Sequence, residues 1–248
     1  MEIRIIFGNT DSRTTECISI TMRTPGDDLN LAAGFLYTEG VIADAAAIQS
    51  VAPLIDDETG ASNIVVVELE PNIDVDMERL HRHFYTTSSC GVCGKASLEA
   101  LSAQSTVPVK GDKLKVTQRV LSGLPDALMR RQDTFSTTGG LHAAGLFQPD
   151  GKIVDAREDV GRHNAVDKLI GNALVKGGLP WWDLGVIVSG RTSFEILQKL
   201  RMAGCPMVAA VGAPSSLAIE LAWEYDMTLV GFLRDSRFNV YSGPARIA

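Results

Sequence analysis

Two cysteines, Cys90 and Cys93, lie three positions apart in the stretch TTSSCGVCGKAS at residues 86–97. Thiolates at this spacing can bind zinc, close a disulfide, or carry sulfur as a persulfide. Zinc needs about four ligands. The nearby His81 and His83 are two residues apart on an expected helix and point to nearly opposite sides. We therefore predict no metal site, while a disulfide and sulfur carriage both remain open.

The residues around the cysteines are compatible with sulfur carriage, although the spacing alone does not select it. Gly91 and Gly94 give the backbone freedom to move between a donor and an acceptor. Lys95 and the start of a following helix favour a thiolate, the reactive form of cysteine. Cys90 and Cys93 are therefore the candidate catalytic residues, one carrying sulfur and the other stabilising or resolving the persulfide.

Two turns between an apolar strand and a helix carry small and polar residues. They are SGRTSFE, with Ser189, Gly190, Arg191 and Thr192, and GAPSS, with Gly212, Ser215 and Ser216. Small residues let backbone N–H groups approach a ligand, and helix amino ends favour anions. Arg191 can make a forked contact to phosphate. The alternative is simple helix capping by Ser and Thr, but two adjacent turns and an arginine favour a nucleotide-like ligand.

Two further segments are rich in candidate binding residues. EDVGRHNAVDK contains Arg162, His163, Asn164, Asp167 and Lys168, and STTGGLHAAG contains Gly139, Gly140 and His142. His163 and Asp167 are one helical turn apart and share a face. A solvated helix face with ion pairs is the alternative for the first segment, and a structural histidine is the alternative for His142.

The composition is that of an ordinary soluble protein: 248 residues, 45% hydrophobic and 21% charged. A net charge of −7 argues against a broad nucleic-acid surface. No run approaches the roughly 20 apolar residues that span a bilayer, so we expect no membrane segment. The polar start MEIRIIFGNTDSR does not resemble a secretory signal, and we expect a cytoplasmic protein with reduced thiols. Cys17 and Cys205, each alone in an apolar segment, are predicted core residues.

The second half of the chain alternates strands and helices. A hairpin is expected around QPDG and a helix over 158–178, followed by strand, helix, strand, helix and strand to residue 233. Because these strands are apolar throughout, they predict a parallel sheet covered on both faces, an α/β fold. The first half predicts strands at 3–7, 17–22 and 63–70 and a helix over 24–40 capped by Thr24. We place a boundary between domains 1–110 and 111–248.

Five segments occur in an order that resembles the FdhD family of formate dehydrogenase accessory sulfurtransferases. They are SSCGVCGK, TTGGLHAAGLF, EDVGRHNAVDKLIG, SGRTSFEILQK and GAPSSLAIELA. MRTPGDDLNLAAGFLYTEGVI upstream is also similar to that family, so the resemblance covers nearly the whole chain.

The resemblance implies a sulfur carrier. Cys90 would accept persulfide sulfur from a cysteine desulfurase and deliver it to the molybdenum (or tungsten) bis-guanine-dinucleotide cofactor of the formate dehydrogenase catalytic subunit. It also implies a homodimer and a cytidine deaminase-like three-layer C-terminal domain beside a smaller α+β N-terminal region. The guanine-dinucleotide contacts would include Val230, Gly231, Phe232, Leu233 and Arg234, and GDP would imitate half of one dinucleotide arm.

Two other functions remain as alternatives. A zinc-dependent hydrolase of the deaminase type needs a glutamate two residues after its histidine ligand and a nearby cysteine pair. Ala165 stands where that glutamate is required, and no cysteine lies near Ser189. A non-catalytic chaperone that only holds the cofactor or the apo-enzyme would use the same binding surface as a sulfur carrier.

Overall fold

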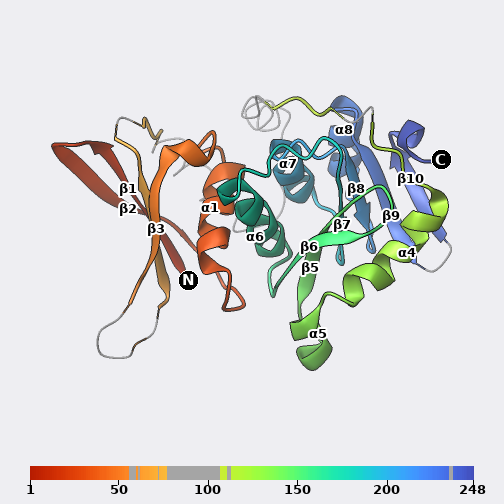
Figure 1. The fold of residues 1–248 in the computed structure, drawn as a ribbon, viewed down its shortest axis with the longest axis horizontal. Helices are drawn as coiled ribbons and strands as arrows, with labels where there is room; N and C mark the ends of the chain where they lie inside the picture. The colour runs from red at the N-terminus through yellow and green to blue at the C-terminus, as the bar shows by residue number, and fades with distance from the viewer. Residues whose placement is uncertain (56–59, 61, 72, 77–106, 111–112, 235–236) are drawn as a thin grey trace.

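A computed structural model describes residues 1–55, 60, 62–71, 73–76, 107–110, 113–234 and 237–248. These residues form two mixed sheets with helices between and around them (Figure 1), which confirms the α/β prediction. Cys90, Cys93, His81 and His83 lie outside the described residues. Among the helices that are described, none has the length and apolar character to cross a membrane.

The first sheet has the strand order β2-β1-β4-β3. Its strands are β1 (Glu2–Asn9), β2 (Ser12–Ile20), β3 (Ile48–Leu54) and β4 (Ile64–Leu69). β1 pairs antiparallel with β2 and parallel with β4, and β3 pairs antiparallel with β4. Three of these strands were predicted. β3 was not, because Ile48, Val51 and Leu54 recur every three residues rather than every two.

Helix α1 (Asp28–Thr38) covers one face of this sheet (Figure 1). It is followed by the 3-10 turn η1 (Ala45–Ala47). The predicted cap was wrong: the helix begins after Asp27, whose φ is 57°, and no side chain caps it. Thr24 is engaged elsewhere, because its Oγ1 accepts a hydrogen bond from Val160 N at 3.0 Å. Thr24 therefore makes a tertiary hydrogen bond in place of the predicted helix cap.

The second sheet has the order β10-β9-β8-β7-β5-β6. Its strands are β5 (His142–Phe147), β6 (Ile153–Asp159), β7 (Gly185–Val188), β8 (Met207–Ala210), β9 (Thr228–Arg234) and β10 (Arg237–Ser242). β7, β8 and β9 are parallel, as predicted, and β5–β6 is the expected hairpin. The edge strand β10 and the 3-10 turn η2 (Pro244–Arg246) were not predicted.

Helices pack on both faces of the second sheet. α6 (Arg162–Val175), α7 (Phe194–Met202) and α8 (Ser216–Glu224) share one apolar core with α1 and the first sheet. α4 (Gln118–Met129) places Leu121, Leu124 and Leu128 in a second core with Phe147 and Ile187. The short helix α5 (Asp133–Thr138) follows it. α6 begins later than predicted, because residues 158–159 still pair with β5.

The two sheets are joined through the crossing of α1 with α6. A Cβ on Gly34 would lie 1.9 Å from Asp167 O, and one on Gly171 would lie 1.9 Å from Asn30 O. Only glycine permits backbones to approach this closely. The shared core runs across the predicted boundary at residue 110, and the division into two domains stays a prediction.

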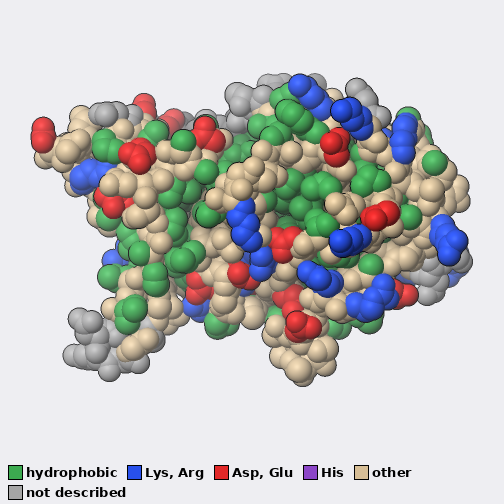
Figure 2. All heavy atoms as spheres, viewed as in Figure 1, with side chains coloured by type: hydrophobic (Ala, Val, Ile, Leu, Met, Phe, Trp, Pro, Cys, Tyr) green, Lys and Arg blue, Asp and Glu red, His purple; other side chains and the backbone are tan. Residues whose placement is uncertain are grey.

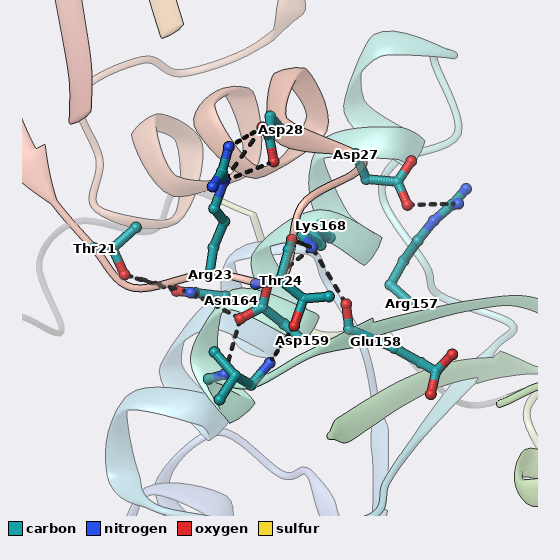
Figure 3. Close-up of polar contacts among 12 residues, drawn as sticks. Thr21, Arg23, Thr24, Asp27, Asp28, Arg157, Glu158, Asp159, Asn164 and Lys168 are labelled. Atoms are coloured by element: carbon teal, nitrogen blue, oxygen red, sulfur yellow. Dashed lines mark hydrogen bonds and ion pairs between the residues drawn. The ribbon is translucent and has the colours of Figure 1, made fainter. Parts of the chain in front are cut away.

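A buried polar cluster fixes the start of α6 (Figure 3). The Lys168 ammonium lies 2.7 Å from the Asp159 carboxylate and donates to Thr24 O at 2.8 Å. The same carboxylate accepts hydrogen bonds from Gly161 N and from Asn164 Nδ2. Because Thr24 belongs to the segment that leaves the first sheet, this cluster ties that segment to the turn that precedes α6.

The two lone cysteines differ from one another. Cys205 is buried, as predicted, and burial raises the pKa of its thiol to about 12. Cys17 is exposed, so its core prediction was wrong. Successive strand residues face opposite sides, and the neighbouring Ile18 takes the buried position instead.

Candidate functional site

Three segments predicted to bind a ligand meet at the carboxyl ends of the parallel strands. Gly212 N, after β8, donates to Gly190 O, after β7, at 3.0 Å, and Phe232 N in β9 donates to Gly212 O at 3.1 Å. A Cβ on Gly212 would lie 2.8 Å from Gly190 O. This close packing requires glycine at position 212. The two hydrogen bonds hold the backbones of Gly190, Gly212 and Phe232 side by side.

Phe232 is conformationally unusual. Its φ is 53°, in the left-handed region that bulky residues rarely adopt, and its side chain is 43% exposed. Strain of this kind persists only when the surroundings impose it, and it is common at ligand sites. Within the predicted contact segment, Val230 and Leu233 instead pack in the second core, and Arg234 is exposed. The side chains available to a ligand here are therefore Phe232 and Arg234.

His142 lies beside these turns, and two arginines, Arg162 and Arg191, act on it electrostatically. The His142 ring contacts the Gly190 turn so closely that a Cβ on Gly190 would lie 3.1 Å from His142 Nδ1. Burial lowers the pKa of His142, and the charges of Arg162 and Arg191 lower it further. Arg162 Nε is buried and has no hydrogen-bond partner among the described residues. The positive charges of Arg162 and Arg191 therefore act on His142 beside the Gly190 turn, which favours binding of an anion there.

Thr192 is a second buried polar group without a partner. Its side chain is 1% exposed, and no described group bonds its Oγ1. Its backbone is fully engaged, since Thr192 N donates to Ala213 O and Thr192 O accepts from Ser215 N. A buried hydroxyl without a hydrogen bond is costly, so Thr192 leaves an unsatisfied polar group in the turn between β7 and α7.

His163, in the first turn of α6, is partly buried beside the start of α7. Its Nε2 lies 3.1 Å from Ser193 Oγ. Burial, together with the charges of Arg162 and Lys199, lowers the pKa of His163 to about 4. The imidazole is therefore neutral at physiological pH, and it links the first turns of the two helices.

The acidic and basic residues of α6 are not a solvated face. Asp167 is buried and bonds Thr38 Oγ1 at 2.8 Å and Lys199 Nζ at 3.1 Å. Lys199 also pairs with Glu39 at 2.8 Å. Burial raises the pKa of Asp167 to about 6. Burial lowers the pKa of Lys199, but the Asp167 and Glu39 carboxylates more than offset this and raise it. The alternative of solvent-exposed ion pairs was therefore wrong for Asp167 and for Lys168.

Some predicted site residues have structural hydrogen bonds. Ser215 caps α8, because its Oγ accepts from Ala218 N at 3.2 Å, and Ser216 opens that helix at the surface. Ser189 Oγ accepts from Ala143 N at 2.8 Å and so completes the pairing of β5 with β7. The capping explanation thus accounts for Ser215, while Gly190, Gly212 and Arg191 retain their predicted place at the turns.

The sequence comparison identifies the family. The model of the FdhD/NarQ family matches residues 13–248. The chain belongs to the FdhD/NarQ family. It is 52% identical over 235 residues to "Sulfur carrier protein FdhD" of Streptomyces coelicolor, covering 93% of this chain and 83% of the relative. It is 49% identical over 239 residues to the protein of that name from Mycobacterium tuberculosis, covering 93% and 86%.

A solved structure supports the fold of this FdhD/NarQ member. It is a crystal structure of a provisionally assigned formate dehydrogenase accessory protein from Desulfotalea psychrophila, with a TM-score of 0.68 and 24% identity. The match covers 100% of this chain and 90% of that chain. At this identity the likeness extends to the fold alone.

The FdhD/NarQ chain also has a cleft that sequence reasoning found only in part. Its volume is about 450 Å³. Gly139, Gly140, His142 and Ser189 were predicted site residues and line it, together with Pro125, Leu128, Met129, Gln132, Phe135, Leu141 and Val211. Pro125, Leu128, Met129, Gln132 and Phe135 were missed because no element was assigned over 113–138, whereas Leu141 and Val211 lie next to predicted site residues and were not singled out. Leu121, Leu124 and Leu128, at helical spacing, were the signal for α4.

Nothing in the described part of this FdhD/NarQ chain supports zinc chemistry. Among those residues no three His, Cys, Asp or Glu side chains gather as metal ligands. His163 bonds Ser193, and the position two residues later is the buried Ala165. Cys90 and Cys93, the candidate catalytic residues, lie outside the described residues.

Proposed function

We propose that this chain is a sulfur carrier protein that matures formate dehydrogenase. Cys90 takes sulfane sulfur from a cysteine desulfurase and delivers it to the molybdenum or tungsten bis-guanine-dinucleotide cofactor of the catalytic subunit. Two facts support the carrier role: the relatives at about half identity are named sulfur carriers, and the chain holds the glycine-flanked pair Cys90 and Cys93.

The sulfur step is a thiol exchange. The Cys90 thiolate attacks the outer sulfur of the donor's persulfide, so a new S–S bond forms on Cys90 as the donor's thiolate leaves. Attack by Cys93 on Cys90 Sγ then forms a disulfide and releases hydrosulfide for the cofactor. A cellular dithiol must reduce that disulfide before the next cycle.

The meeting of the Gly190, Gly212 and Phe232 backbones beside the His142 ring is the observation that carries the cofactor assignment. The charges of Arg162 and Arg191, which act on His142, suit the pyrophosphate of a dinucleotide, and the turns that hold Gly190 and Gly212 precede helix amino ends, which favour anions. Exposed Phe232 offers a face on which guanine can stack. The proposed contacts are Gly139, Gly140, His142, Arg162, His163, Ser189, Gly190, Arg191, Thr192, Gly212, Ser216, Gly231, Phe232 and Arg234.

The proposal includes a cytidine deaminase-like three-layer architecture for the C-terminal domain, without the deaminase reaction. Helices on both faces of the second sheet agree with such layers. It also includes a homodimer as the working unit. The competing role, a chaperone that holds the cofactor without moving sulfur, is separated from the carrier role by experiment.

Intact-mass analysis after incubation with a desulfurase and cysteine tests the carrier role. The wild-type chain should gain one sulfur, which proteolysis maps to residues 86–97. Cys90→Ala should not gain it, and should fail to activate formate dehydrogenase while still binding GDP. If Cys90→Ala still yields active formate dehydrogenase, the persulfide mechanism is wrong and the holding role is favoured.

Calorimetry with GDP tests the cofactor site independently. Arg191→Ala should weaken GDP binding by about tenfold or more, because a charge-assisted bond contributes about 1.5–3 kcal/mol. Its matched control is Arg119→Ala, at an exposed arginine of α4, which should leave both GDP binding and sulfur loading unchanged. Absence of GDP binding at millimolar concentration would contradict the cofactor assignment. It would leave the sulfur-carrier role unaffected, because the mass analysis tests that role separately.

A further inference from the structure

The four-stranded sheet has one face that no described element covers. α1 packs on the inner face, where Ile3, Ile5, Val65 and Val67 are buried (Figure 1). We call the opposite side the outer face and define it by Ile6, Ile20, Leu54, Ile64 and Val66. Ile6, Ile64 and Val66 belong to neither apolar core. The outer face thus carries aliphatic side chains that belong to neither apolar core, beside the Glu2–Arg4 ion pair.

Strand register gathers these side chains into one surface. Ile20, Glu2, Ile64 and Leu54 lie opposite one another in a single row across all four strands. Arg4 and Val66 lie in the next row, and Arg4 pairs with Glu2 at 2.6 Å. The ends of the first row are open, with Ile20 79% and Leu54 48% exposed. The exposed aliphatic side chain at each end of the row, with the partly exposed Ile64 between them, makes this face a candidate interaction surface.

The charge of the chain decides which partner suits the outer face. Residues 1–76, which form this sheet and α1, hold 14 Asp and Glu against 3 Lys and Arg, while residues 77–248 hold 16 against 20. Figure 2 shows acidic side chains prominent over the end with the first sheet, and most Lys and Arg over the other half. The first part thus has a net charge of −11 and the rest +4.

This asymmetry excludes several occupants. Two copies joined outer face to outer face would bring two regions of charge −11 together, and like charges across an interface cost several kcal/mol. Nucleic acid and anionic membrane are repelled for the same reason. A protein surface with aliphatic side chains ringed by Lys and Arg is attracted, and long-range attraction speeds its association.

We propose that the outer face docks the enzyme that donates sulfur, through a basic surface of that enzyme. This inference rests on the proposed sulfur-carrier function, which requires a donor. The acceptor's cofactor would occupy the other end of the molecule, at the turns holding Gly190 and Gly212, among residues of net positive charge. A donor on the outer face and an acceptor at the turns do not compete for one surface.

The test measures binding of purified cysteine desulfurase to the full chain by calorimetry at low and high salt. Ile20→Lys/Leu54→Lys adds two positive charges at the exposed ends of the row. It should weaken binding at least tenfold, and salt should weaken wild-type binding. The matched control, Val154→Lys/Val175→Lys, adds the same charge at exposed valines of β6 and α6, and should change affinity less than twofold.

Sulfur loading separates this proposal from the function on which it rests. Ile20→Lys/Leu54→Lys should load slowly from limiting desulfurase but normally from sodium polysulfide, which needs no docking. If polysulfide loads no sulfur onto Cys90 of the wild-type chain, the carrier function fails. If both double variants bind desulfurase equally, the docking surface is wrong. A change of Ile20→Lys/Leu54→Lys from dimer to monomer would also overturn it, by showing that the outer face binds a second copy.

Discussion

The crossing of α1 with α6 can be tested at a single atom. In Gly171→Ala, the new Cβ would lie 1.9 Å from Asn30 O and 2.7 Å from Asn30 C. Ordinary contact begins near 3.4 Å, so the two helices must separate locally by about 1.5 Å. The obstacle is backbone, which cannot rotate aside as a flexible side chain can.

Two effects of opposite sign determine the outcome. Alanine in place of glycine inside a helix stabilises it by about 1 kcal/mol. Overpacking costs typically about 1–3 kcal/mol, and a backbone collision lies at or above the top of that range. We therefore expect Gly171→Ala to lower the free energy of unfolding by about 2 kcal/mol, and Tm by roughly 4–8 °C for a chain of this size.

The assay is urea denaturation followed by circular dichroism, with thermal melts as a second readout. Gly123→Ala is the matched control, because Gly123 lies in helix α4 with nothing within 4 Å of its added Cβ. It should raise stability by up to about 1 kcal/mol. If Gly171→Ala proves as stable as Gly123→Ala, the backbones of α1 and α6 are not in contact and the joint between the two sheets is wrong.

Two further predictions concern buried charges. Lys168→Met leaves the Asp159 carboxylate, 0% exposed, without its cation, and should lower the free energy of unfolding by about 3–5 kcal/mol in urea. Because the pKa of His163 is about 4 in the folded chain and about 6.5 unfolded, the unfolded state binds a proton first as pH falls. His163 therefore reduces stability progressively from pH 6.5 to 4, by at most roughly 3 kcal/mol, and His163→Gln should remove that loss.

Each of these two predictions has its own control. Lys176→Met, at an exposed lysine just after α6, should change stability by less than about 0.5 kcal/mol. Asp167, with a pKa raised to about 6, has the opposite pH dependence. Its effect is nevertheless common to wild type and His163→Gln, so the difference between them isolates His163. Parallel pH profiles for the two proteins would contradict a neutral, partly buried His163 with a lowered pKa.

The sequence predicted those elements whose signal is local. Apolar runs gave β7, β8 and β9 with the helices between them, because a strand covered on both faces is apolar at every position. Glycine and polar turns gave the β5–β6 hairpin. The prediction missed β3 because its apolar residues do not alternate. It was wrong at Thr24 because the Thr24 side chain bonds Val160 N instead of capping the helix.

For the site, the sequence determined which residue types stand at the turns and in which order, and that order suffices for the family. The tertiary structure alone decided that Gly190, Gly212 and Phe232 lie side by side and that the His142 ring packs against the Gly190 turn. It also turned the charged residues of α6 into buried ion pairs. The physical reason is that such contacts join positions far apart in the chain, and they form only when the sheets pack. Backbone preferences and hydrophobic periodicity act within a few residues, so they do not identify which distant residue a side chain will contact.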